Sequence, residues 1–142
     1  MPRRLLFIQA CTLLCVGAIH LAALNFYLYW LFPWLDTAVH FLGGLWAMLF
    51  AYSLFLFFRV NITATRVFVL LACMAFGWEL FELWAGAPRE ANFAFDTTVD
   101  LIMDGLGGVF GYFVAKRVIA HATIANHDSS QEDSSTPPIG AA

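Results

Sequence analysis

Charged residues are scarce in this chain. Only 12% of the 142 residues are Asp, Glu, Lys or Arg, whereas 61% are hydrophobic and 17% are aromatic. Soluble domains carry about 25% charged residues, so this composition cannot provide a solvated surface. We therefore expect an integral membrane protein. The chain also lacks a basic patch, which excludes nucleic acid as a partner.

Cysteine is also scarce, and its positions exclude a disulfide framework. Cys11, Cys15 and Cys73 all fall in strongly apolar stretches, where they behave as small apolar residues. No further ligand lies beside Cys11 and Cys15 on their helix face, so a two-thiol metal site is disfavoured. Ser-His-Asp and Cys-His catalytic schemes lack a placed nucleophile.

Four stretches are long and apolar enough to cross the roughly 30 Å hydrocarbon core as helices. They run over about residues 5–24, 39–58, 67–86 and 98–115. Basic residues flank these spans on one side of the membrane: Arg3, Arg4, Arg59, Arg66, Lys116 and Arg117. The positive-inside rule then places both termini in the cytoplasm.

We predict one all-α membrane domain, a four-transmembrane-helix bundle over residues 1–120. Residues 121–142 are rich in Ser, Asp, Thr and Pro and show no apolar periodicity. This composition is typical of a disordered segment, here a cytoplasmic tail.

The acidic residues inside the apolar stretches indicate a functional site. They form three pairs with helical spacing, so the members of each pair share one helix face. The pairs are Asp36 with His40, Glu79 with Glu82, and Asp100 with Asp104. Given the expected topology, all six residues converge on the outer half of the bilayer. His20 lies at a similar depth, where we expect a hydrogen bond to a neighbouring helix.

The charge of this cluster must be balanced. No Lys or Arg lies in any predicted span, and several carboxylates in a small volume cannot all stay ionised. A bound divalent cation or several protons could balance the charge, whereas a water-filled vestibule could solvate part of it. Carboxylates with one imidazole suit Mg, Mn, Ca or Zn, so all six residues are candidate metal ligands. Glu79, Glu82 and Asp100 are the catalytic candidates.

A short sequence repeat supports a shared site. Asp36-Thr-Ala-Val-His40-Phe-Leu-Gly-Gly and Asp100-Leu-Ile-Met-Asp104-Gly-Leu-Gly-Gly have the same spacing. The match suggests two helix hairpins related by a pseudo-twofold axis along the membrane normal. The glycines favour close helix packing rather than a phosphate-binding loop.

The order of these motifs resembles that of VanZ-like membrane proteins, and more closely the small YjdF-type membrane proteins. The resemblance covers Trp34 to Arg117 and rests on three motifs. They are Asp-x3-His, Glu-x2-polar and Asp-x3-Asp-x3-polar-x2-Gly-x3-Gly. VanZ-like proteins usually have Gln and Asn where this chain has Glu82 and Asp104, so the present site is more acidic. The resemblance implies a multi-pass protein of the bacterial cytoplasmic (inner) membrane and, for VanZ, a link to glycopeptide-antibiotic resistance; it supplies no reaction.

Three functions remain open at this point. The first is a metal-dependent membrane enzyme that acts on an envelope lipid or lipid-linked phosphate. The second is a proton- or cation-coupled carrier, although the inner halves of the spans lack charged residues. The third is a non-catalytic lipid-binding or structural protein. Membrane lipids are the expected partners in each case, and the sequence does not indicate the oligomeric state.

Overall fold

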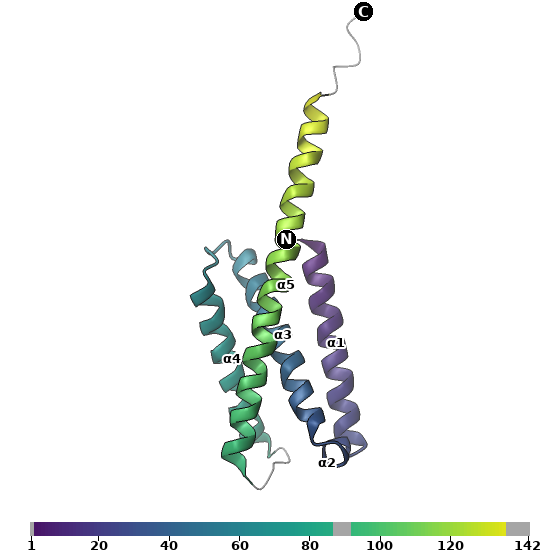
Figure 1. Ribbon diagram of the computed structural model, residues 1–142, viewed down its shortest axis with the longest axis vertical. Coiled ribbons are helices and arrows are strands. Elements are labelled where there is room, and N and C mark those ends of the chain that lie inside the picture. The colour runs from purple at the N-terminus through teal and green to yellow at the C-terminus, as the bar shows by residue number, and fades with distance from the viewer. Residues whose placement is uncertain (1, 87–91, 136–142) are drawn as a thin grey trace, which may run out of the picture.

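The computed structural model describes residues 2–86 and 92–135, with side chains described as far as Ile124. Its elements are all helices: α1 (Arg3–Asn25), α2 (Leu28–Leu31), α3 (Trp34–Phe57), α4 (Ala64–Ala85) and α5 (Phe93–Ser135). The four long helices run alternately up and down in a bundle (Figure 1). We call the end where α1 begins the termini end, and the opposite end the α2 end.

The four long helices fit the predicted spans. Each contains a stretch long and apolar enough to cross a membrane: Arg3–Asn25, Trp34–Phe57, Ala64–Ala85 and Phe93–Ile124. For the described residues, an all-helical architecture with four helices long and apolar enough to cross a membrane is therefore confirmed. The helices begin earlier than predicted: α3, for example, starts at Trp34 and brings Asp36 into its first turn.

The C-terminal segment differs from the sequence prediction. A disordered tail was predicted from residue 121, but the structure continues α5 to Ser135. The segment has no glycine or proline before Pro137, so nothing in its backbone chemistry interrupts the helix, although its composition is polar. The remaining predicted tail, residues 136–142, lies outside the described residues.

Glycines bring α3 and α5 close together at the level of the acidic residues. A Cβ added at Gly44 would collide with the backbone of Asp104, and one added at Gly107 would collide with the backbone of Phe41. At Gly111 an added Cβ would lie 2.8 Å from the carbonyl oxygen of Leu45. The predicted packing role of these small residues is therefore confirmed. This close approach lets short aspartates on α5 reach a histidine on α3.

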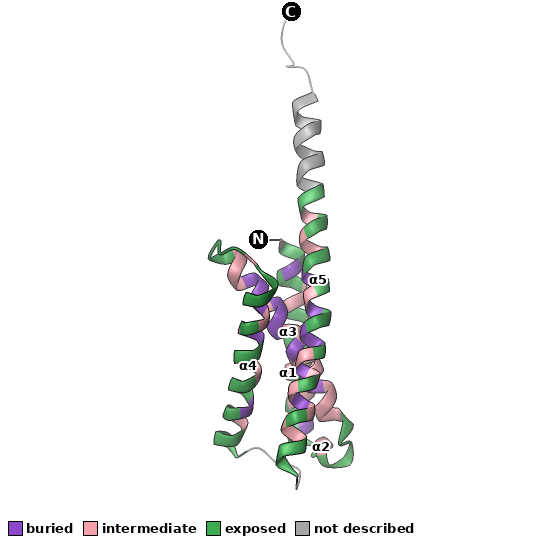
Figure 2. Ribbon diagram, turned by 60° about the vertical axis from the view of Figure 1, so that its left-hand side comes forward, coloured by how far each residue is buried: buried purple, intermediate pink, exposed green. Residues whose placement is uncertain are grey.

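The closed apolar core occupies the termini end of the bundle. Leu5, Met48, Leu49 and Val67 are fully buried there, and they come from α1, α3 and α4. Ser53 of α3 donates a hydrogen bond of 2.8 Å to Gln9 Oε1 of α1 within the same region. Figure 2 shows that burial concentrates on α3, while α4 turns exposed residues outward. Such an apolar outer surface suits a surrounding bilayer.

Candidate functional site

The structure brings the six predicted residues together at the α2 end. Asp36 and His40 lie in the first two turns of α3, and Asp100 and Asp104 lie early in α5. Glu79 and Glu82 lie near the end of α4, which reaches the same end of the bundle from the opposite direction. Side chains of His40, Glu79, Asp100 and Asp104 are buried.

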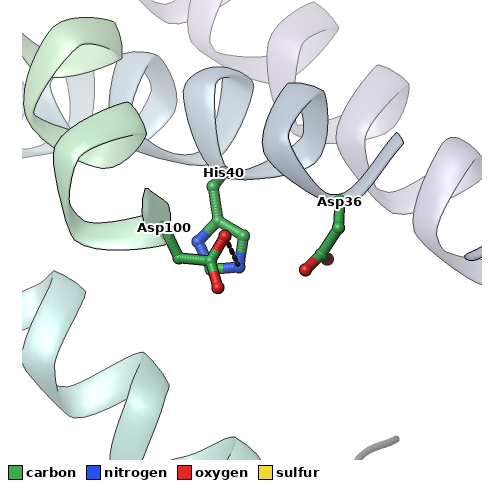
Figure 3. Close-up of side chains that lie close together, drawn as sticks. All are labelled: Asp36, His40 and Asp100. Carbon is green, nitrogen blue, oxygen red and sulfur yellow. Dashed lines mark ion pairs between the residues drawn. The ribbon is translucent and has the colours of Figure 1, made fainter. Parts of the chain in front are cut away.

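His40 is the central residue of this group. Its Nε2 lies 3.8 Å from Asp100 Oδ1, and its Nδ1 lies 3.4 Å from Asp104 Oδ2. The ring is 4% exposed, so both contacts are shielded from water. In Figure 3 the carboxylate of Asp100, from α5, overlies the His40 ring, and Asp36, from α3 like His40, lies to one side.

Two overlapping groups of side chains have the spacing of metal ligands. Asp36, His40 and Asp100 form one group, and His40, Glu79 and Glu82 form the other. Within each group every residue offers a ligand atom within 4.8 Å of the others. Asp104 belongs to neither group but contacts His40 directly. The role of these residues as metal ligands remains a prediction.

The acidic groups line an open cleft of about 460 Å³ at the α2 end. Besides Asp36, Glu79, Glu82 and Asp100, its walls include Asp96 and Thr97 of α5. None of the described residues that line the cleft is Lys or Arg. Sequence reasoning had not placed Asp96 in the site, although it lies one helical turn before Asp100 on the same face.

The segment after α1 supplies a further wall of the cleft. Tyr27 adopts a left-handed backbone with φ of 57°, and this turns the chain so that α2 lies across the end of α1. The hydroxyl of Tyr29 lies 2.6 Å from His20 Nδ1, so the predicted hydrogen bond of His20 to a neighbouring helix is confirmed. Burial, with the nearby charges of Asp36 and Glu82, raises the pKa of Tyr29 above its ordinary value. The hydroxyl therefore keeps its proton at neutral pH.

Electrostatic repulsion disfavours full ionisation of this cluster without a counter-charge. Carboxylate oxygens of Asp36 and Asp100 approach within 4.8 Å, as do those of Glu79 and Glu82. At that distance two unit charges repel by about 3.5 kcal/mol at an effective dielectric constant of about 20. A divalent cation would attract both carboxylates of each pair and outweigh their repulsion, whereas protons would only remove the repulsion. The geometry therefore suits either a cation or shared protons.

Comparisons with known proteins give this site no precedent: no family model matches the chain, and no curated protein or solved structure is significantly similar to it.

Proposed function

We propose that this protein binds a divalent cation at the acid and histidine cluster and acts on an envelope lipid or lipid-linked phosphate. Asp36, His40 and Asp100 would hold the cation, and Glu79 and Glu82 would face it from α4. The supporting observation is that carboxylates from three helices surround one buried histidine. Mg and Mn fit this donor set, because oxygen atoms predominate in it, and Ca or Zn are further candidates.

The contacts of His40 favour metal binding over a purely structural role. When Nδ1 carries the proton, it donates to Asp104, and this leaves the Nε2 lone pair facing Asp100. Metal-binding histidines usually donate their second ring N–H to a carboxylate in this way, which fixes the ring and raises its basicity. Asp104 would therefore orient His40 rather than bind the cation itself.

A phosphate-bearing lipid is the substrate class that fits the cleft. The cleft opens at the end of the bundle, where lipid headgroups lie if the four helices cross the bilayer. Its carboxylates would repel a bare phosphate, but a bound cation bridges such groups and polarises the phosphate oxygens. Glu79, Glu82 or Asp100 could then accept a proton from an attacking water or hydroxyl group.

A carrier function has less support. The core at the termini end is closed by apolar side chains, and its polar pair, Ser53 with Gln9, carries no charge. No described acidic side chain continues from the cleft through that core, so no charged route crosses the bundle.

We also propose that the chain belongs with the VanZ-like proteins and lies in the bacterial inner membrane, with both termini cytoplasmic and the cleft at the outer face. The three motifs that resemble those of VanZ-like proteins support the family. The basic residues at the termini end support the cytoplasmic termini.

Reconstitution tests the proposed activity. Protein in phosphatidylcholine vesicles containing phosphatidic acid and a polyprenyl phosphate should hydrolyse these lipids with water and release inorganic phosphate when Mg or Mn is added. A His40→Gln variant should lose this turnover. Metal binding without turnover of either phosphate lipid would contradict an enzyme and favour the non-catalytic lipid-binding function.

A further inference from the structure

A second cavity adjoins the acidic cleft but differs from it in chemistry. It measures about 270 Å³ and is bounded by α1, α3 and α4, with Asp104 of α5 at one end. Its walls are almost entirely apolar or glycine: Leu13, Val16 and Gly17 of α1, Val39, Gly43, Gly44, Trp46 and Ala47 of α3, and Leu71, Met74, Ala75 and Trp78 of α4. We call this cavity the apolar groove.

The groove exists because the backbones of α1 and α4 stay apart. Both helices contact α3, but their described backbones make no direct contact with one another. The groove spans about seven residues of each helix, for example His40 to Ala47 on α3, which corresponds to about 10 Å along the axis. Leu71 and Ala47 belong to the closed core and end the groove on that side.

The wall residues identify the environment of the groove. All of them lie within the four apolar spans. Leu13 and Trp78 are 48% and 40% exposed, so they form an outer rim that faces the surroundings of the bundle. In a bilayer those surroundings are hydrocarbon, and the walls away from His20, His40 and Asp104 offer water little polar contact. An acyl chain is therefore the occupant that matches both the walls and the medium.

The groove joins the acidic cleft at a defined junction. His20 lines both cavities, and His40 and Asp104 line the groove at the end nearest the acids. The rings of His20 and Trp78 meet nearly edge to face across the gap between α1 and α4, with centroids 6.1 Å apart. A molecule with a charged head and an apolar tail could thus occupy both cavities at once.

One polar atom of Trp46, which lines the groove, also lacks a partner. Trp46 Nε1 is buried and makes no hydrogen bond to any described residue. A buried N–H without an acceptor destabilises a protein by about 1–3 kcal/mol. Because this atom is inaccessible, an occupant of the groove reaches it only if the indole moves.

We infer that the apolar groove binds one acyl chain of a phospholipid whose phosphate lies in the acidic cleft. The inference rests on the proposed function for the position of the phosphate. It goes further by assigning the substrate's tail to a site between α1 and α4. The protein would thereby select lipids from the bilayer plane, with the tail entering between these two helices.

Two glycines allow a matched test. An added Cβ meets no atom within 4 Å at either Gly17 or Gly77, so both positions tolerate a larger side chain. Of these two glycines, only Gly17 lines the groove, and Leu at this position would project into it. Ala75→Leu would obstruct the groove independently from the opposite wall. Gly77→Leu is the control, because it adds the same volume to α4 outside the groove.

The experiment uses the full chain in phosphatidylcholine vesicles containing phosphatidic acid with a photoreactive diazirine on one acyl chain. Labelling of the groove positions is measured by peptide mass spectrometry, relative to labelling at the outward-facing Phe113. We expect Gly17→Leu and Ala75→Leu to remove most groove labelling and Gly77→Leu to leave it unchanged. Unchanged labelling in both groove variants, or an equal loss in the control, would overturn the inference.

A metal arm separates this inference from the proposed function. Labelling is repeated with Mn, with chelator, and with a diazirine diacylglycerol that has no phosphate. Stronger labelling by phosphatidic acid in the presence of Mn supports both proposals. If the groove variants remove labelling, but Mn and the phosphate group have no effect on it, the acyl-chain site is upheld and the metal function is contradicted. Mn binding with no effect of the groove variants contradicts the acyl-chain site alone.

Discussion

Replacing Asp100 with asparagine is the sharpest perturbation of the proposed metal site. Asp100→Asn keeps the shape of the side chain but removes a carboxylate that lies 3.8 Å from His40 Nε2. Asp96→Asn is the matched control, because Asp96 lies one turn earlier on α5 and lines the same cleft. Both variants remove one negative charge, but Asp96 belongs to neither ligand group.

The expected size of the effect follows from mass action. A cation present at a hundred times its dissociation constant stabilises the parent by about 2.7 kcal/mol. For a chain of this size that gain corresponds to a rise of roughly 5–10 °C in Tm. If the loss of one carboxylate weakens binding about a hundredfold, the same concentration stabilises Asp100→Asn by only about 0.4 kcal/mol.

Thermal unfolding in detergent, with and without Mg or Mn, measures these shifts. The parent and Asp96→Asn should gain stability with metal and lose the gain with chelator, whereas Asp100→Asn should gain almost nothing. An equal loss of response in Asp96→Asn and Asp100→Asn would refute the assigned ligands, because overall charge would then explain the effect.

Four further predictions follow from other contacts. Asp104→Asn should weaken metal binding about 10- to 100-fold, because Asp104 only orients His40; unchanged affinity in a Mn titration would remove that role. Glu82→Gln should raise stability in chelator at pH 8 by about 1–3 kcal/mol, because the side chain repels Glu79 in the metal-free state; no gain would show that a proton already balances this pair. Gly107→Ala should destabilise the bundle by about 1–3 kcal/mol through overpacking, whereas Gly105→Ala, with open space around its Cβ, should not; equal thermal unfolding of the two variants would contradict the close packing of α3 and α5. C-terminal alkaline phosphatase fusions should be inactive and green fluorescent protein fusions bright, because the basic residues favour a cytoplasmic C-terminus; an active phosphatase fusion would reverse the proposed topology.

The sequence predicts the helices and the convergence of the acids for simple physical reasons. Length and hydropathy determine which stretches can span a bilayer, and the spacing of Asp36 with His40 places both on one helix face. Short loops then alternate the helix directions, which brings the acids to one end. Gly44 and Gly107 indicated close packing between helices, and the structure identifies those helices as α3 and α5.

The remaining features depend on contacts between segments. Helix spacing does not reveal that α1 and α4 leave a groove, because this depends on which helices pack together. The contact of Tyr29 with His20 requires the left-handed turn at Tyr27, a backbone state that is rare for tyrosine and that its sequence does not signal. The polar composition of residues 121–135 does not reveal that α5 continues to Ser135, whereas the lack of Gly and Pro there permits it.

Direct measurement of bound metal tests the central claim. Equilibrium dialysis of the purified parent against Mn, with bound Mn quantified by elemental analysis, is compared with a Glu79→Gln, Asp100→Asn variant that removes one carboxylate from each ligand group. We predict saturable Mn binding by the parent and its loss in the variant. A parent that binds no Mn, Mg, Ca or Zn, and whose stability rises only on acidification, would contradict the metal site and indicate shared protons instead.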